Sequence, residues 1–169
     1  MSVSQSTSEF PPAYLITFRT YGSWLHGDTK GSVDRVHNRP DTDLVPPDER
    51  KFGAMQSRMS GNAVTLDESQ RLCVEQAIAG VCEYRAWELL TIHVRTNHVH
   101  VVVAAPVDPE KVMNDFKVWA TRKLRKAKLF DADAKIWSRH GSTRYLWDER
   151  AKEDAGHYTV NGQGVDLSP

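Results

Sequence analysis

The sequence predicts an α+β protein with the ferredoxin-like split β-α-β fold. This fold is one four-stranded antiparallel sheet with helices on one face, here followed by a C-terminal helix that carries a tyrosine. Two observations predict it. Segments rich in β-branched and aromatic residues alternate with segments in which apolar residues recur every three or four positions. Their order is strand, helix, strand, strand, helix, strand and terminal helix, as this fold requires.

The first half of the chain supplies one strand and one main helix. Residues 14–20, which follow a Pro pair, are β-branched and aromatic and predict the first strand. Residues 27–66 are rich in Gly, Asp, Pro and Arg and are too long for a simple connection, so we expect an irregular insert with one short helix near 48–59. Thr65 or Asp67 is then the expected N-cap of the first main helix.

The second half supplies the other elements. Residues 87–105 predict a β-hairpin around Asn97, a residue that suits a tight turn. Residues 110–130 predict a second amphipathic helix, with its basic residues away from the apolar stripe. A short fourth strand at 142–147 and a third helix from 148 to about 162 complete the pattern.

Length and composition predict a single soluble domain. We expect a disordered lead at 1–12, one domain at 13–164 and a tail at 165–169. No apolar run approaches the roughly 18 residues of a membrane span, and the opening residues lack the pattern of a signal peptide. Cys73 and Cys82 fall on one helix, about 13 Å apart, too far for a disulfide. Free thiols indicate a cytoplasmic protein.

Charge is balanced overall but uneven along the chain. There are 22 Lys and Arg against 22 Asp and Glu. Between Lys111 and Lys128, however, Asp115 is the only acid among several basic residues. Such a segment can hold a polyanion, although a solvated helix face explains it equally simply.

Two histidines stand out in the stretch "NHVHVVV". Side chains alternate across a strand, so His98 and His100 share one face of the predicted sheet and can bind a cation together. A polar open face would explain the pair without a ligand. Among the tyrosines, Tyr158 is the best candidate nucleophile, because its helix is mostly polar, whereas Tyr84 and Tyr145 are expected in the core.

Five stretches resemble the single-tyrosine HUH transposases, in particular the insertion-sequence-200-like and REP-associated tyrosine transposases. They are "AYLITFRTYGSWLHGD", "WELLTIHVRTNHVHVVVAA", "VMNDFKVWATRKLR", "WSRHGSTRYLW" and "HYTVNGQG". The resemblance implies a metal-dependent endonuclease and strand transferase that acts on single-stranded DNA with hairpin ends in DNA transposition. It also implies a homodimer.

The resemblance assigns roles to particular residues. His98 and His100 match the pair that binds Mg²⁺ or Mn²⁺, and Tyr158 matches the nucleophile that forms a 5'-phosphotyrosine. Gln163 matches the polar residue that completes the metal site. In an ideal helix Gln163 would lie about 140° round the axis from Tyr158, and Asn161 about 60°, so Asn161 remains an alternative third ligand.

DNA would be held by basic residues near this site, and phosphate contacts supply affinity without reading sequence. The candidates are Lys117, Arg122, Lys123, Arg125, Lys126, Arg139 and Arg144. His93, on the neighbouring strand, is a candidate to support the metal site. Three alternatives stay open: a non-catalytic or domesticated DNA-binding protein of the same fold, a replication-initiator-like nickase, and an α+β binding module whose histidines merely face solvent.

Overall fold

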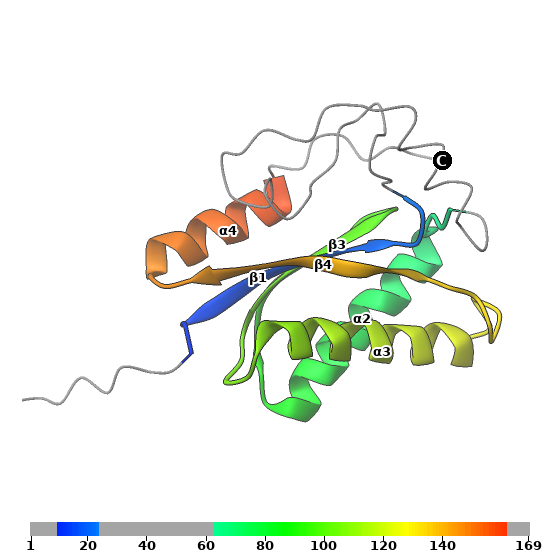
Figure 1. Cartoon of the computed structure of the whole chain (residues 1–169), viewed down its shortest axis with the longest axis horizontal. Helices are drawn as coiled ribbons and strands as arrows, with labels where there is room; N and C mark the ends of the chain where they lie inside the picture. The colour runs from blue at the N-terminus through cyan, green and yellow to red at the C-terminus, as the bar shows by residue number, and fades with distance from the viewer. Residues whose placement is uncertain (1–9, 24–62, 162–169) are drawn as a thin grey trace, which may run out of the picture.

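The computed structural model describes residues 10–23 and 63–161. Its elements follow one another as β1 (Ala13–Thr20), α2 (Glu68–Arg85), β2 (Glu88–Val94), β3 (His98–Ala104), α3 (Pro109–Lys126), β4 (Trp137–Leu146) and α4 (Glu149–Asn161). The strands form one antiparallel sheet in the order β2-β3-β1-β4. Figure 1 shows this arrangement, which confirms the predicted split β-α-β fold.

Several sequence-based expectations fall outside the described residues. Residues 24–62 contain most of the expected insert and its short helix near 48–59. Residues 1–9 and 162–169 contain most of the lead and the whole tail. The proposed domain limits therefore stay predictions.

The two faces of the sheet are covered differently. Helices α2 and α3 lie on one face, and α4 lies on the other (Figure 1). The α2–α3 face buries a large cluster of valine, isoleucine and aromatic side chains. The α4 face buries a small cluster of Ala13, Leu15, Val102, Leu146 and Ala155. Most of the hydrophobic stabilisation therefore comes from the α2–α3 face, because the free energy of burial scales with the apolar area removed from water.

Alternation along β1 and β3 produces these two faces. In β1, Tyr14, Ile16 and Phe18 point into the α2–α3 core, and Leu15 points toward α4. In β3, every second residue is a valine of the α2–α3 core: Val99, Val101 and Val103. Side chains alternate with a period of two, so the residues between these valines, including His98 and His100, face α4.

Helix α2 begins at one of the two predicted caps. The Asp67 side chain accepts a hydrogen bond from the backbone N–H of Gln70 at 2.8 Å, and the Gln70 Oε1 accepts one from the Asp67 N–H at 2.9 Å. This reciprocal pair is a capping box. The hydrogen bond from the Gln70 backbone is the main cause that lowers the pKa of Asp67. The structure therefore confirms Asp67, and not Thr65, as the cap.

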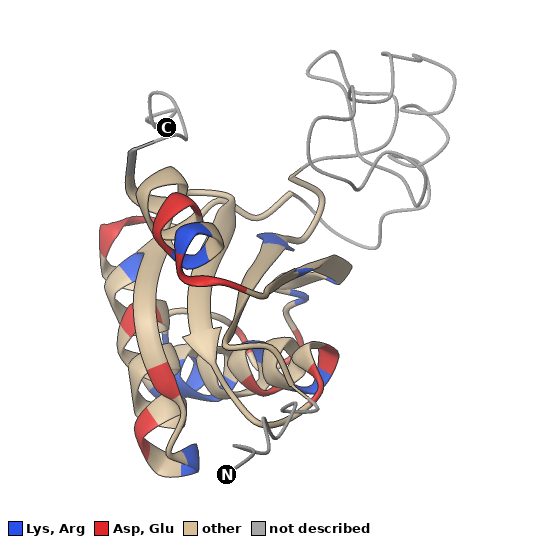
Figure 2. Cartoon of the chain, turned by 90° about the vertical axis from the view of Figure 1, so that its left-hand side faces the viewer, with Lys and Arg blue, Asp and Glu red and all other residues tan. Residues whose placement is uncertain are grey.

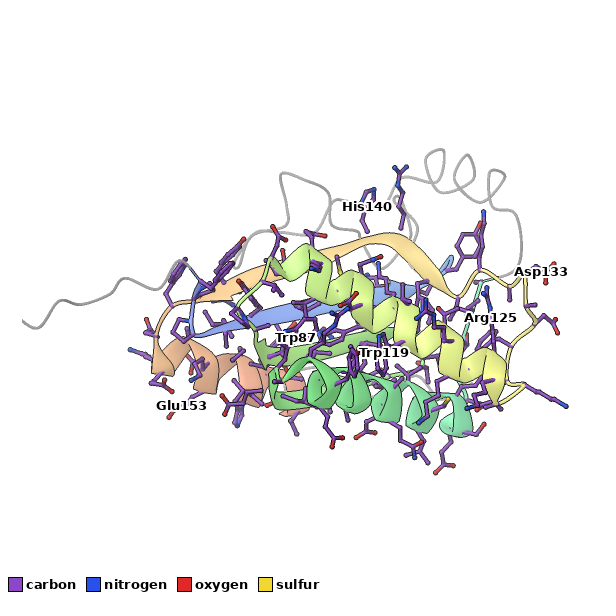
Figure 3. All side chains as sticks on the ribbon, turned by 90° about the horizontal axis from the view of Figure 1, so that it is seen from below. Trp87, Trp119, Arg125, Asp133, His140 and Glu153 are labelled. Atoms are coloured by element: carbon purple, nitrogen blue, oxygen red, sulfur yellow. The ribbon has the colours of Figure 1, made fainter. Side chains whose placement is uncertain are left out.

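Helix α3 packs against α2 and the sheet as its apolar spacing predicts. The buried residues on this stripe are Val112, Met113, Phe116, Ala120 and Leu124. An ion pair of 3.2 Å between Arg85 and Asp115 joins the two helices. In Figure 3, Trp87 and Trp119 lie between α2 and α3, whereas His140 points away from both helices.

Strand β4 begins earlier than predicted, at Trp137 instead of residue 142. Phe18 pairs with Gly141 but Thr20 pairs with Trp137, so β4 contains an irregularity at residues 138–140. The Lys117 ammonium donates to the carbonyl oxygens of all three of these residues, at 3.0, 3.4 and 3.4 Å. The first residues of β4 are thus held by β1 and by Lys117 of α3. Their polar sequence shows no strand alternation, so the sequence did not predict them as part of the strand.

Two further observations concern membranes and thiols. Within the described ranges 10–23 and 63–161, no helix is both long and apolar enough to cross a bilayer. Cys73 and Cys82 are both buried free thiols, in agreement with the expected absence of a disulfide between them. Burial raises the pKa of Cys82 to about 11, so this thiol stays protonated and unreactive at neutral pH.

Gly141 leaves no room for a larger residue, and this predicts a stability effect. A Cβ at this position would lie 2.5 Å from the Thr17 carbonyl oxygen and would also collide with the Met113 sulfur. We expect Gly141→Ala to lower the free energy of unfolding by about 1 to 3 kcal/mol, because a backbone atom must move. Urea unfolding followed by tryptophan fluorescence measures this change.

The matched control is Gly80→Ala in α2. A Cβ there lies 4.0 Å from the Trp119 ring, an ordinary contact. Alanine is the better helix former, so this variant should gain up to about 1 kcal/mol. Equal effects of the two substitutions would show that the Gly141 site can relax and would contradict the prediction.

Candidate functional site

His98 and His100 lie side by side on the α4 face of β3. Their ring centroids are 4.7 Å apart and the ring planes meet at 83°. His100 is only 6% exposed, and His98 is half-buried at the start of the strand. The spacing predicted from the sequence therefore brings the two imidazoles together.

Each imidazole is oriented by a hydrogen bond at Nδ1. His98 Nδ1 lies 2.5 Å from Asn97 Oδ1, and His100 Nδ1 lies 2.9 Å from Thr17 Oγ1. An amide oxygen only accepts, so His98 donates from Nδ1 and keeps its lone pair on Nε2. Thr17 Oγ1 can accept in the same way from His100. Imidazoles held through Nδ1 are oriented to coordinate through Nε2, as in proteins where an outer partner orients a metal-binding histidine.

The turn before His98 is held by the end of β1. The Asn97 carbonyl oxygen accepts hydrogen bonds from the Thr20 N–H at 3.0 Å, the Thr20 hydroxyl at 3.1 Å and the Ser23 hydroxyl at 3.2 Å. Thr20 is fully buried. These contacts fix the backbone of Asn97, whose side chain in turn orients His98.

Tyr158 comes from the last turns of α4. Its ring centroid lies 6.4 Å from that of His100, with the planes at 81°, and the side chain is 50% exposed. Helix α4 rests on the sheet through Ala151 and Ala155. The tyrosine that the sequence singled out is thus adjacent to the histidine pair and accessible from solvent.

Arg19 is a cation on the same face. It pairs with His98 across the β1–β3 ladder, and paired residues point to the same side. Burial lowers the pKa of Arg19 to about 10, and a favourable interaction with Tyr158 acts in the opposite direction. The guanidinium is still protonated at neutral pH. Figure 2 shows how Lys and Arg residues, in blue, are distributed over the helices and strands.

Together these groups bring two oriented imidazoles, a phenol and a guanidinium to one face of the sheet. A model of IS200-like transposases matches residues 62–149, more than half of the 169 residues. The chain belongs to the IS200-like transposase family. The matched region of this transposase contains His98 and His100, whereas Thr17, Arg19 and Tyr158 lie outside it and are brought beside them by the geometry described above.

The structure of a REP-associated tyrosine transposase bound to a REP hairpin resembles this transposase with a TM-score of 0.49 and 13% sequence identity, over 98% of this chain and 76% of that chain. No curated protein matches the sequence.

The third metal ligand of the transposase stays a prediction. Gln163 and the side chain of Asn161 lie outside the described residues. In the part of the chain that the structure describes, no three His, Cys, Asp or Glu side chains gather as a ligand set. Metal binding by His98 and His100 therefore stays a prediction as well.

The predicted DNA-binding residues fall into two groups. Those on α3 lie across the sheet from the histidines, and of these Lys117 is hydrogen-bonded to β4 carbonyl oxygens and has its pKa lowered by burial. Arg139 lines a cavity of about 300 Å³ between α3 and β4. Arg144 pairs with Leu15 and therefore faces the same side as the site. The role of each residue at DNA stays a prediction.

Sequence reasoning missed two residues of the site, Thr17 and Arg19. Both are polar residues at alternate positions of an otherwise apolar strand, a signal that could have placed them on an open face. The reasoning about tyrosines was partly wrong. Tyr84 is 72% exposed and Tyr145 is 46% exposed, so neither is a core residue.

Proposed function

We propose that this protein is a metal-dependent tyrosine transposase: a single-stranded DNA endonuclease and strand transferase that acts through a 5'-phosphotyrosine on Tyr158. The observation that carries the proposal is the position of Tyr158, whose ring lies 6.4 Å from that of His100 although 57 residues of sequence lie between them. Family membership supports DNA transposition as the process.

The reaction proposed for Tyr158 is a transesterification. Its phenolic oxygen attacks a phosphorus atom of the DNA, the phenol loses its proton, and the bond from phosphorus to the 3' oxygen breaks. The leaving oxygen takes up a proton and becomes a 3'-hydroxyl, while the 5' phosphate stays on Tyr158. Attack by another 3'-hydroxyl reverses the step and joins strands, so no ATP is consumed.

His98 and His100 would hold a divalent ion through their Nε2 atoms, with Gln163 or Asn161 as the proposed third ligand. When bound, the ion would neutralise charge on a non-bridging phosphate oxygen. Two nitrogen ligands suit Mn²⁺ better than Mg²⁺, which prefers oxygen. Thr17 and Asn97 support this role, because their hydrogen bonds hold the imidazoles in place.

Arg19 is proposed to bind the phosphate under attack. A guanidinium can donate two parallel hydrogen bonds to phosphate oxygens and keeps its charge at neutral pH. Its pairing with His98 across the β1–β3 ladder and its electrostatic interaction with Tyr158 support this role. Its role would be to fix the phosphate for in-line attack.

We further propose that the substrate is DNA with hairpin ends, that the protein is a homodimer and that it acts in the cytoplasm. The non-catalytic DNA-binding protein and the replication-initiator-like nickase remain the alternative functions. An accessible tyrosine beside the two histidines favours catalysis, because a protein that only binds DNA has no need of a nucleophile there.

The first prediction tests the nucleophile. The protein is incubated with labelled single-stranded DNA that carries the hairpins flanking its own gene, with Mn²⁺ or Mg²⁺, and analysed by denaturing electrophoresis. We expect a covalent protein–DNA band that Tyr158→Phe and a chelator both abolish. Tyr84→Phe is the matched control, since Tyr84 is exposed on α2 across the sheet and should retain the band. Tight binding without any covalent band would favour the non-catalytic alternative.

The second prediction concerns the orientation of His100. Thr17→Val keeps the shape of the side chain but removes the hydroxyl beside Nδ1. We expect Mn²⁺ affinity, measured by the electron paramagnetic resonance of unbound Mn²⁺, to fall by about tenfold or more. His100→Ala should reduce it further, and wild type should bind Mn²⁺ more tightly than Mg²⁺.

Thr143→Val is the matched control for this substitution. Thr143 pairs with Ile16 and therefore belongs to the α2–α3 side of the sheet. Loss of the Thr143 hydroxyl should leave Mn²⁺ affinity at the wild-type value. If Thr17→Val also bound Mn²⁺ like wild type, the hydrogen bond to His100 would have no part in metal binding.

The third prediction concerns Arg19. Arg19→Ala should slow formation of the covalent complex at saturating DNA by about two orders of magnitude, because the phosphate loses a donor that is placed before reaction. Arg19→Lys should lie between this variant and wild type, since it restores the charge but not the paired donors. Arg71→Ala on α2 serves as the control. A weaker DNA affinity with an unchanged rate at saturation would make Arg19 an ordinary DNA contact.

A further inference from the structure

A hydrogen bond joins the nucleophile's helix to the edge of the sheet. His93 Nδ1, on β2, lies 2.8 Å from the carbonyl oxygen of Thr159, the residue after Tyr158. A carbonyl oxygen only accepts, so Nδ1 is the donor. The last four carbonyls of a helix have no partner within the helix, and α4 ends at Asn161, so the Thr159 carbonyl is one that a side chain can cap.

The same two strands connect this bond to the histidine pair. His93 pairs with His100 across the β2–β3 ladder. His100 is in turn the ring beside Tyr158. Two contacts therefore join the end of α4 to this pair of strands. The Tyr158 ring lies beside His100, and the Thr159 carbonyl oxygen is hydrogen-bonded to His93.

The apolar contacts of α4 with the sheet lie nearer its start. They come from Ala151 and Ala155, which belong to the small cluster on this face. Alanine has no side chain long enough to interdigitate and prevent a small rotation. Tyr158 and Val160 are half exposed, and Thr159 is fully buried with its hydroxyl donating to the Ala155 carbonyl at 2.7 Å. Thr159 is thus the point at which the last turn meets the sheet.

We infer that His93 is a positioning residue for the nucleophile: it caps the Thr159 carbonyl and so holds the last turn of α4 with Tyr158 beside the His98–His100 pair. This inference rests on the proposed function. It assigns His93 to the tyrosine's helix, whereas the sequence suggested support of the metal. Loss of the cap allows the last turn to move, and a displacement of about 1 Å at a reacting group can cost a hundredfold in rate.

The test uses three variants that differ in where they place a donor. His93→Asn puts an amide N–H at the position of Nδ1, His93→Gln puts one nearer the position of Nε2, and His93→Leu has none. The rate of covalent complex formation at saturating DNA should fall about tenfold to a hundredfold in the Leu and Gln variants and recover to within about threefold of wild type in Asn. DNA affinity should not change.

A second readout does not depend on activity. Backbone hydrogen exchange of the peptide that contains residues 155–161, measured without DNA, should be faster in the Leu and Gln variants and near wild type in the Asn variant. Exchange in β3 should be unchanged in all three. His140→Leu removes an exposed histidine from β4 and is the matched control, with exchange in α4 like wild type.

Each outcome decides the inference. Rescue by Gln but not by Asn would overturn it, because His93 would then act through Nε2. Wild-type rates and exchange in the Leu variant would overturn it as well. If wild type forms no covalent complex, the proposed function fails. Hydrogen exchange of residues 155–161 still decides whether His93 holds α4, through the comparison of His93→Asn with His93→Gln. The same comparison decides the inference if His93→Leu does not fold.

Discussion

The antiparallel pairing of β1 with β3 is the constraint on which the rest of the structure depends. It places Thr17 opposite His100 and Arg19 opposite His98. A shift of one residue would turn both histidines into the valine core and the valines toward α4, because the side-chain period of a strand is two. The large α2–α3 core makes such a shift costly, since Val99, Val101 and Val103 would lose their burial. The core therefore holds the register, and the register assembles the site.

The unequal packing of the two faces separates stability from chemistry. The α2–α3 face is closed by large apolar side chains, whereas the α4 face is closed by a few small ones. A lightly packed face leaves room for polar groups, and here each histidine of the pair has a defined partner: Asn97 for His98 and Thr17 for His100. Such partners keep the imidazoles in one orientation, as the proposed site for a metal ion and a phosphate requires.

The arrangement also restricts how DNA could lie on the protein. The basic residues of α3 are separated from the histidines by the thickness of the sheet, whereas Arg144 on β4 faces the histidine side. β4 is an edge strand. At this edge Lys117 holds the irregular backbone of residues 138–140.

The sequence by itself determined the elements and their order, the shared face of His98 and His100, a helix start at Thr65 or Asp67 and a helix that carries Tyr158. These features follow from residues close together in the chain, because periodicity and capping are local. Only the tertiary structure decided that Thr17 and Arg19 lie opposite the histidine pair, that His93 is hydrogen-bonded to α4, that α4 covers the face opposite α2 and α3, and that β4 begins at Trp137. Strand register and helix docking unite residues distant in sequence, and no local pattern records which partner each will meet.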